Sequence, residues 1–537
     1  RMEEVTDRIA AGETAAQIVE KAKAEGTGYK ASVEQMYYGN QQFLFVYEQF
    51  DDVRLVAAPP SSIGKFGGDT DNWIWPRHTG DFSMFRVYAS KDNRPAAYSP
   101  QNVPYRPKKH FSISTKGVKE GDFTMIYGFP GNTQEYILSD AVAYIAERSD
   151  PAKIAIRTGR LDIITKAQES DPALRIHYAA KHASIANAWK KWQGEALGID
   201  RRGTVAAKFD YETQFGLWSV GRPEYAGVVM GLRVEYDRIM DAYFAYEITR
   251  ETLSTLPAAY TPEERAEECF ARRKFAEQAL WRHAFREYGR CPKVYRTPSY
   301  AEGMARYKSP EAYADALFEA VWEGSDSVAM RPAVRLREET KRMLDHISWM
   351  LGTKSLRNLN SKILNELYTT YIKGLREWDR ERAFYPDANL TLRVAYGSVA
   401  GYEYADGEYH KPQTTLDGII AKDNPEIYDY DIPQSLRDLY ASKNYGRWGT
   451  VIDGRRTVPV CFLATNHTTG GNSGSPVLNA GGELIGINFD RTWRSTMSDI
   501  AFDPAICRNI AVDIRYVLFV VDRIGGAGYL LKEMTLK

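Results

Sequence analysis

The chain has few cysteines and histidines, no excess of either charge and no long apolar run. Its 70 basic and 70 acidic residues give a formal net charge of zero, and neither sign forms a long block. We therefore expect no nucleic-acid partner, because binding to phosphates needs a concentrated positive surface. No stretch reaches the roughly 18 apolar residues of a membrane span, so no transmembrane helix is expected.

The four cysteines do not have the close paired spacing of metal-binding motifs, and we expect neither a metal nor an organic cofactor. They are Cys269, Cys291, Cys461 and Cys507. Cys269 and Cys291 could form a disulfide in an oxidising compartment, and free buried thiols are the equal alternative.

A short glycine-rich segment carries the strongest chemical signal. Residues 468–477 read Thr-Thr-Gly-Gly-Asn-Ser-Gly-Ser-Pro-Val, a pattern typical of the nucleophile loop in chymotrypsin-like serine peptidases. Attack by the Ser473 hydroxyl would place negative charge on a carbonyl oxygen. The N–H groups of Gly471 and Ser473 can stabilise that charge if the glycines permit a tight turn. The alternative is a Gly/Asn/Ser hairpin without catalysis. Residues 483–489 predict a buried strand that follows this loop.

A serine nucleophile needs a base and a carboxylate that orients the base. Residues 66–89 combine a loop rich in Gly, Asp and Pro with a predicted strand over residues 82–88. Asp81 lies at the start of this strand and is our candidate for the carboxylate, with Asp69 and Asp71 as weaker candidates. The structural alternative for Asp81 is a turn or cap residue.

Two segments together resemble one bacterial peptidase family. Residues 72–83, Asn-Trp-Ile-Trp-Pro-Arg-His-Thr-Gly-Asp-Phe-Ser, and residues 470–477 are similar to motifs of the family that contains dipeptidyl-peptidases 7 and 11. The resemblance covers nearly the whole chain. It implies a serine exopeptidase that releases dipeptides from peptides, with Asp81 as the triad carboxylate.

The resemblance also implies how the substrate amino group is held. The matching positions are Asn72, Trp73, Asn187 and Asp490. An ammonium group favours a carboxylate and neutral oxygen acceptors, and an indole face adds cation–π attraction. The alternatives are a structural asparagine on a helix for Asn187 and an ion pair at a strand end for Asp490.

Arg491 predicts the subtype. It lies 18 residues after Ser473, where dipeptidyl-peptidases of type 11 resemble one another in having Arg and those of type 7 in having Gly. A guanidinium in the pocket for the residue before the scissile bond (P1) would favour Asp or Glu, because its planar fork matches a carboxylate. An apolar P1 residue would leave the cation buried and unpaired, at a cost of several kcal/mol. The alternative is an Arg491 that faces solvent.

The general base cannot be assigned within the chain. The histidines are His78, His110, His177, His182, His283, His346, His410 and His467. In the chymotrypsin order the base precedes the carboxylate, and no histidine precedes His78. We expect the base and any export signal to lie upstream, and residues 1–148 to be the remainder of an N-terminal barrel that opens on a helical pattern at residues 2–24. His467 and His78 are weaker candidates, since each lies too close in sequence to its presumed partner.

The predicted fold is mixed α and β: a chymotrypsin-like double β-barrel with a large inserted helical domain. Asp81 and Ser473 are 392 residues apart, more than two small barrels need. Residues 149–385 are rich in helix-forming residues, with helical apolar spacing at residues 343–351, and predict the inserted cap. Residues 386–537 predict the second barrel, which ends in an amphipathic helix at residues 514–521.

The resulting hypothesis is a dipeptidyl-peptidase that acts on peptides and prefers Asp or Glu at P1. The resemblance further implies a homodimer in the periplasm or at the surface of a Gram-negative bacterium. Three alternatives stay open: a type 7-like enzyme with apolar P1 preference, an endopeptidase without an amine clamp, and a non-catalytic peptide-binding protein.

Overall fold

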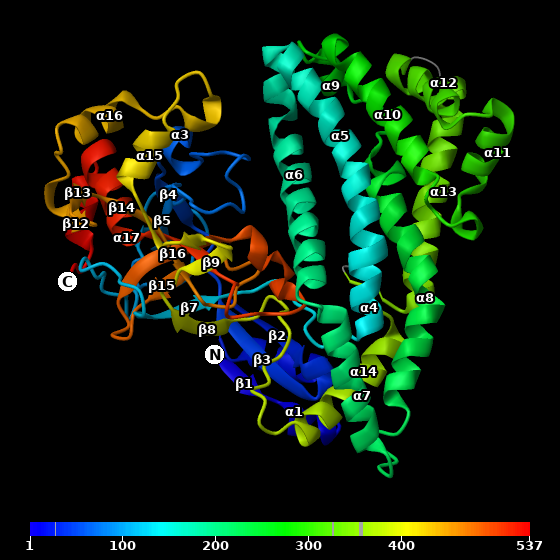
Figure 1. Cartoon of the computed structure of the whole chain (residues 1–537), viewed down its shortest axis with the longest axis horizontal. Helices are drawn as coiled ribbons and strands as arrows, with labels where there is room; N and C mark the ends of the chain where they lie inside the picture. Colours follow the sequence, from blue (N-terminus) through cyan, green and yellow to red (C-terminus); the bar gives the residue numbers. More distant parts are fainter. Residues whose placement is uncertain (27, 325–326, 354–357) are drawn as a thin grey trace. The chain divides into compact units, whose positions relative to one another are not determined.

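The computed structural model describes residues 1–26, 28–324, 327–353 and 358–537 and has mixed α and β structure (Figure 1). The chain forms two compact units. One, here called the sheet unit, consists of Arg1–Tyr136 and Ala383–Lys537. The other, the helical unit, is Ile137–Arg382. The mixed fold class is therefore confirmed, whereas the three-part division at residues 148 and 385 stays a prediction.

The helical unit contains no β-strand among its described residues. Its α-helices are α4 (Ser139–Tyr144), α5 (Asp150–Ser170), α6 (Pro172–Arg201), α7 (Thr204–Ser219), α8 (Val228–Glu251), α9 (Pro262–Ala266), α10 (Lys274–Tyr288), α11 (Pro298–Tyr307), α12 (Pro310–Glu323), α13 (Ser327–Leu351) and α14 (Lys362–Trp378).

Local sequence explains where these helices begin and how they pack. Asp171 separates α5 from α6, because its side chain accepts from the backbone N–H of Ala173 at 2.7 Å and Pro172 occupies the first helical position. The apolar spacing at residues 343–351 lies in α13, where Ile347 and Leu351 are buried, as predicted.

The main sheet of the sheet unit is seven-stranded and fully antiparallel. Its order is β11 (Gln413–Thr415), β14 (Pro459–Ala464), β17 (Asn509–Asp513), β16 (Leu484–Arg491), β15 (Pro476–Leu478), β7 (Phe123–Gly128) and β8 (Arg393–Ser398). The strand predicted at residues 483–489 is thus confirmed as β16.

One contact joins strands that are distant in this order. Val399 forms an isolated antiparallel bridge with Ala464, and the N–H of Thr465 donates to the carbonyl of Ser398 at 2.9 Å. This connects the end of β8 to the end of β14, but as a single bridge rather than a ladder. No sheet in the described part of the chain closes, so the predicted double β-barrel is not confirmed.

Two smaller three-stranded sheets also belong to this unit. One has the order β1 (Met2–Glu4), β3 (Gln41–Glu48), β2 (Tyr29–Met36), and the other the order β4 (Val53–Ala57), β5 (Met84–Ala89), β6 (Val103–Pro104). The strand predicted at residues 82–88 corresponds to β5 with a shift of its start.

The helical pattern predicted for residues 2–24 is only partly right. Residues 2–4 form β1 and pair with β3, and the helical remainder is split into α1 (Thr6–Ala10) and α2 (Ala15–Ala24). Gly12, with φ +97°, lies in the break, and a capping box at Thr14 starts α2.

The segment predicted as an amphipathic helix is helical but not amphipathic. It forms α17 (Ile514–Phe519) followed by a π-helical turn (Val520–Ile524), and residues 514–521 are buried on all sides. It therefore belongs to the core of the sheet unit, with Trp448, Tyr516 and Phe519 among its large side chains.

The four cysteines are free thiols, so the Cys269–Cys291 disulfide is not formed. Among the described residues, no helix combines the length and apolarity needed to cross a membrane.

Candidate active site

Glycine geometry shapes the loop that carries Ser473. Gly471 and Gly474 have φ values of +108° and +84°, which side chains rarely adopt. A Cβ atom on Gly471 would lie 2.3 Å from the carbonyl oxygen of Phe129, so only glycine fits there. Ser473 is exposed, and its hydroxyl donates weakly to the carbonyl of Phe489 at 3.4 Å. The loop thus presents a hydroxyl to solvent from a tightly constrained turn.

Three buried asparagines anchor this loop to the sheet. The side-chain oxygen of Asn472 accepts from the N–H of Thr469 at 3.0 Å. Asn488 on β16 donates to the carbonyl of Asn472 at 3.2 Å, and Asn509 on β17 donates to Asn488 at 2.9 Å. Sequence reasoning missed Asn488 and Asn509, which lie in other segments and carry no local motif.

The N–H groups of Gly471 and Ser473 point to no acceptor within the described residues. Buried or constrained N–H groups are normally paired. Two N–H groups that lie next to a serine hydroxyl and donate to no acceptor can form an oxyanion hole. The sequence prediction for these two groups is therefore compatible with the loop geometry.

Asp81 follows Gly80, which is held in place by close packing against Tyr516 and Ile63. A Cβ atom on Gly80 would lie 2.8 Å from the ring of Tyr516 and 2.9 Å from Ile63, so glycine is required at this point. Asp81 is exposed on one side, and no described residue donates a hydrogen bond to its carboxylate. Its pKa is raised, chiefly by partial desolvation, with Asp490 adding and Arg77 opposing. The carboxylate is thus open to a further donor.

The weaker candidate Asp71 is engaged in contacts of its own. Its side chain is buried and accepts from Lys422 at 2.8 Å and from the hydroxyl of Tyr430 at 2.9 Å. Asp69 remains a weaker candidate.

Neither histidine considered as a base is suited to that role. Burial lowers the pKa of His78 to about 3, and the ring is packed so closely that a Cβ on Gly418 would lie 2.0 Å from its Nε2. Burial also lowers the pKa of His467, to about 4. The Nε2 of His467 lies 3.0 Å from the carbonyl of Ser498, and its ring stacks on Phe502. Both imidazoles are held in the neutral form by contacts of their own.

The predicted amine-binding residues of the sheet unit lie together. Asp490 accepts from the backbone N–H of Trp73 at 3.2 Å and from Arg77 at 2.7 Å. Trp73 has φ +66°, a strained value for a side chain of this size. Asn72 precedes it and is half-buried. The ion pair considered as the alternative for Asp490 is therefore present, with Arg77 as its unforeseen partner.

Asn187 lies in the helical unit, exposed on α6. Its role in amine binding stays a prediction.

Arg491 ends β16 just after a β-bulge between Asn488 and Asp490. A bulge interrupts the alternation of faces, and the adjacent side chains of Asp490 and Arg491 are both buried. The solvent-facing alternative for Arg491 is therefore wrong. Its guanidinium carbon lies 5.5 Å from the centre of the Trp73 ring.

The guanidinium of Arg491 already has a carboxylate partner. It donates through Nη1 and Nη2 to the two oxygens of Asp499 at 2.7 and 2.9 Å. Nη1 also donates to the carbonyl of Thr468 at 3.2 Å and to the hydroxyl of Ser498 at 2.8 Å. Asp499 lies at the end of a 3-10 segment (Trp493–Asp499) in which no sequence motif marked it.

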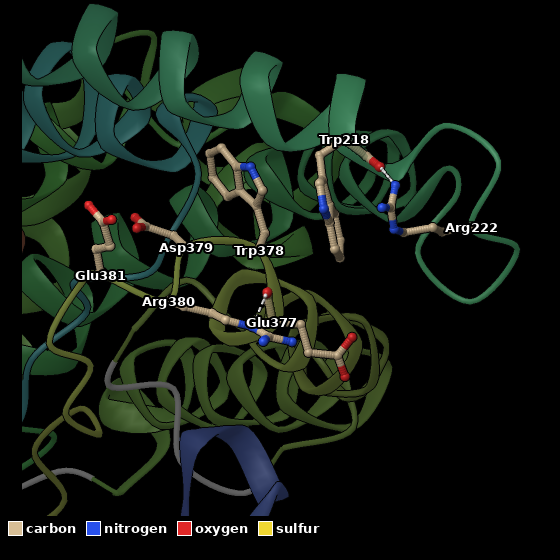
Figure 2. A pocket seen from close by; sticks show the side chains of 7 residues that line it. All are labelled: Trp218, Arg222, Glu377, Trp378, Asp379, Arg380 and Glu381. Atoms are coloured by element: carbon tan, nitrogen blue, oxygen red, sulfur yellow. Dashed lines mark hydrogen bonds between the residues drawn. The ribbon is translucent and has the colours of Figure 1, made fainter.

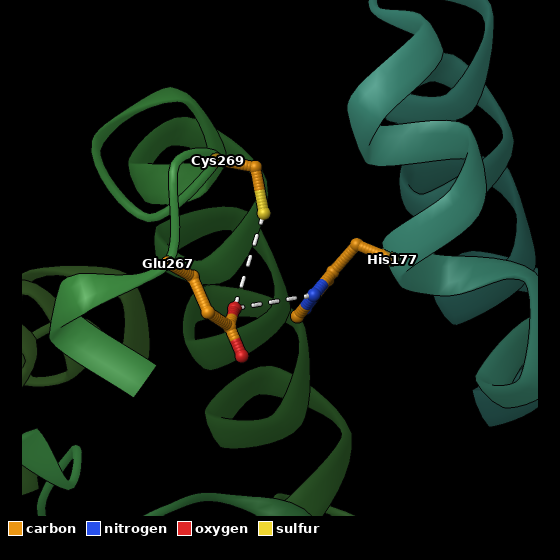
Figure 3. Close-up of side chains that lie close together, drawn as sticks. All are labelled: His177, Glu267 and Cys269. Atoms are coloured by element: carbon orange, nitrogen blue, oxygen red, sulfur yellow. Dashed lines mark hydrogen bonds and ion pairs between the residues drawn. The ribbon is translucent and has the colours of Figure 1, made fainter. Parts of the chain in front are cut away.

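His177, Glu267 and Cys269 of the helical unit form a group of metal-ligand type (Figure 3). The Nδ1 of His177 lies 3.5 Å from Glu267, and the Cys269 sulfur lies 3.9 Å from it. However, Arg273 lies 2.7 Å from the Nε2 of His177 and 3.1 Å from Glu267. A guanidinium in contact with two of the three groups opposes a metal cation. We therefore interpret this group as an ion-pair cluster.

A pocket of about 580 Å³ also belongs to the helical unit (Figure 2). Its lining residues are Trp218, Arg222, Glu377, Trp378, Asp379, Arg380 and Glu381. The guanidinium of Arg222 lies over the Trp218 ring at 4.3 Å, and Asp379 accepts from the hydroxyl of Tyr211 at 2.8 Å. Since its lining contains no serine, cysteine or histidine, this pocket offers no nucleophile or imidazole base.

Comparison with known proteins gives a consistent result along the whole chain. A profile of the family described as Peptidase S46 matches residues 2–262 and 261–536. An Asp/Glu-specific dipeptidyl-peptidase of Capnocytophaga gingivalis is 43% identical over 551 residues, which cover 94% of this chain and 76% of the relative. A dipeptidyl-peptidase 7 of Phocaeicola vulgatus is 35% identical over 550 residues, which cover 95% of this chain and 76% of that relative.

A solved structure is similar as well. The crystal structure of Porphyromonas endodontalis DPP11 in complex with the dipeptide Arg-Glu matches with a TM-score of 0.84 and 32% identity. The match covers 100% of this chain and 85% of that chain.

Proposed function

The chain belongs to the peptidase S46 family and is a serine peptidase, and we propose that it releases N-terminal dipeptides with Asp or Glu at P1. The observation that carries the proposal is the constrained Ser473 loop with the buried guanidinium of Arg491 bound to its Thr468 carbonyl at 3.2 Å. A nucleophile beside a fixed cation has the chemistry to cleave after an acidic residue.

The proposed reaction is acyl transfer from the peptide to Ser473. The hydroxyl attacks the second peptide carbonyl, and the N–H groups of Gly471 and Ser473 stabilise the oxyanion. The carboxylate of Asp81 orients the imidazole of the general base and stabilises it when it is protonated. The absence of a donor to Asp81 among the described residues supports this role.

The proposed amine clamp limits the enzyme to N-terminal dipeptides. Asp490 would accept from the substrate ammonium, while Asn72 and Asn187 would supply neutral oxygens and Trp73 an aromatic face. The ion pair with Arg77 at 2.7 Å fixes the direction of the Asp490 carboxylate. Blocking the substrate amine by acetylation should therefore abolish cleavage, whereas an endopeptidase would still act.

A type 7-like preference for apolar P1 residues is the second candidate. It is favoured by the Arg491–Asp499 pair, because a guanidinium already paired with a carboxylate is not left as an isolated buried charge when the P1 residue is apolar.

Architecture, location and assembly are further proposals. We propose that the seven-stranded sheet is one barrel of a chymotrypsin-like pair, a view that the Val399–Ala464 bridge supports. On resemblance alone, we propose a homodimer in the periplasm or at the cell surface of a Gram-negative bacterium. Sedimentation of the purified protein and fractionation of the producing cell would test these two points.

The test of function is hydrolysis of fluorogenic Xaa-Asp, Xaa-Glu, Xaa-Leu and Xaa-Lys dipeptides by the full-length protein and by its Arg491→Gly variant. We expect an acidic preference in the parent that is lost in the variant. Cleavage of Xaa-Leu by both would favour the type 7-like candidate. Failure to cleave any substrate, together with failure of a fluorophosphonate to label Ser473, would favour a peptide-binding protein.

A further inference from the structure

Asp499 neutralises the charge of Arg491, and this changes how the guanidinium can interact with a substrate side chain. Both carboxylate oxygens of Asp499 accept from the guanidinium, and the side chains of Arg491 and Asp499 are only 5% and 12% exposed. Two parallel charge-assisted hydrogen bonds in a buried setting form a strong interaction. The cation is therefore neutralised before any substrate arrives.

The pair also fixes the direction of the guanidinium. Nη1 donates to Asp499, to the hydroxyl of Ser498 and to the carbonyl of Thr468, so three acceptors surround this one nitrogen. Thr468 belongs to the segment that leads into the nucleophile, and its carbonyl ties the guanidinium to that segment. Asp499 thus positions Arg491 as well as neutralising it.

Two energetic consequences follow for a substrate side chain beside Arg491. A neutral P1 residue leaves the guanidinium paired with Asp499 and avoids the penalty of an isolated buried charge. An acidic P1 residue gains attraction to Arg491 but meets repulsion from the carboxylate of Asp499. Both effects reduce the discrimination that an unpaired arginine would give.

We propose that Asp499 is a specificity-determining residue that acts through Arg491 and sets how strongly the enzyme prefers acidic over neutral P1 residues. The proposal rests on the function proposed above and extends it. Removal of the negative charge of Asp499 should sharpen the preference for acidic P1 residues, and retention of that charge in a longer side chain should not.

The test uses substrates that differ only in charge. Xaa-Asp and Xaa-Asn fluorogenic dipeptides have nearly the same shape, and the ratio of their kcat/KM values reports charge recognition. We expect Asp499→Asn to raise this ratio about tenfold relative to the parent, because one opposing charge is removed. Asp499→Glu should stay close to the parent ratio.

A matched control is Asp453→Asn. Asp453 is an exposed carboxylate that pairs with Lys411 at 2.7 Å in the turn between β12 (Thr450–Ile452) and β13 (Arg455–Thr457). This variant removes the same charge from the surface and should leave the ratio unchanged.

The ratio is independent of the fraction of enzyme that folds, because both substrates compete for the same active molecules. A destabilised Asp499→Asn preparation therefore still gives an answer, and Asp499→Ser provides a second neutral variant. An unchanged or lowered ratio in both neutral variants would overturn the proposal. If the parent cleaves neither substrate, the proposed function fails; if it cleaves them and the neutral variants do not differ from it, only the role of Asp499 fails.

Discussion

Two buried arginine–aspartate pairs in the sheet unit have nearly the same chemistry and different surroundings. Arg491 and Asp499 form one, with hydrogen bonds of 2.7 and 2.9 Å. Arg515 and Asp513 form the other, with hydrogen bonds of 2.9 and 2.7 Å. All four side chains are at most 12% exposed. Burial and bidentate geometry alone thus do not separate the pair that we propose to be functional from the other one.

The surroundings do separate them. Asp513 caps α17 by accepting from the backbone N–H of Arg515 at 2.9 Å, and the guanidinium packs beneath Gly117, where a Cβ would lie 2.3 Å from it. That pair closes a helix start. Arg491 instead contacts the Thr468 carbonyl and faces the Trp73 ring. Its partner Asp499 lies eight residues later, so the pair connects the end of β16 to the 3-10 segment that follows it.

The largest effect is expected for Ser473, which lies in the loop that Arg491 contacts, and it tests whether catalysis takes place at this loop. Ser473→Ala should reduce kcat/KM by about 10⁴-fold or more, because no nucleophile remains. Its thermal unfolding temperature should match that of the parent, since Ser473 is exposed. Steady-state kinetics and calorimetry of the full-length protein measure both, and substantial residual activity would reject Ser473 as the nucleophile.

Asp513→Ala should remove the ion pair between Arg515 and Asp513. It removes a helix cap and leaves Arg515 buried without its carboxylate, so we expect the free energy of unfolding to fall by about 3–5 kcal/mol. Urea unfolding measures the loss. The Xaa-Asp to Xaa-Asn ratio of the remaining folded enzyme should be that of the parent, and a shifted ratio would show that the two pairs are not functionally distinct.

Gly471→Ala tests the proposed oxyanion role of the N–H group of Gly471, in the loop that Arg491 contacts. The new Cβ would meet the Phe129 carbonyl at 2.3 Å and disfavour φ +108°, which turns the N–H of residue 471 away. Loss of one oxyanion donor costs about 10²- to 10³-fold in kcat. Gly474→Ala, which also has positive φ but no atom within 4 Å of the added Cβ, is the matched control and should lose less. Equal losses would contradict the oxyanion role of Gly471.

A smaller effect is expected in the pH dependence of stability. It should report on the surroundings of the Arg491–Asp499 pair, because His467 lies beside this pair and not beside Arg515 and Asp513. Its pKa of about 4 is below the ordinary value of about 6.5, so folding favours the neutral form. The resulting stability is present above pH 6.5 and is lost as pH falls from 6.5 toward 4, by about 2 kcal/mol at pH 5.

His467→Gln, which keeps an N–H donor for the Ser498 carbonyl, should lose less stability between pH 7 and pH 5 than the parent in urea unfolding. His346→Gln changes an exposed histidine and serves as the control. Identical pH dependence in the parent and His467→Gln would show that His467 is not held neutral.

Local patterns predicted the elements near the nucleophile but not their partners. The strand at residues 483–489 and the apolar face of α13 follow from periodicity, which neighbouring residues alone determine. The helix α17 was harder to predict: it is buried on all sides because it lies in a core, so a pattern of one buried face does not describe it. The helical prediction for residues 2–4 was wrong because tertiary contacts decide their structure. These residues pair with β3 and therefore form a strand.

The sequence alone singled out as candidates the glycine-rich loop of Ser473, the segment that ends at Asp81, and Arg491. These depend on short-range requirements: glycines where the backbone must turn, a serine between them and a carboxylate at a strand entrance. Only the tertiary structure decided that Arg77 pairs with Asp490 and that Asp499 pairs with Arg491. Arg77 and Asp490 are 413 residues apart, and Arg491 and Asp499, although separated by only eight residues, lie on different elements. The energy of a buried charge depends on which groups folding brings within hydrogen-bond distance.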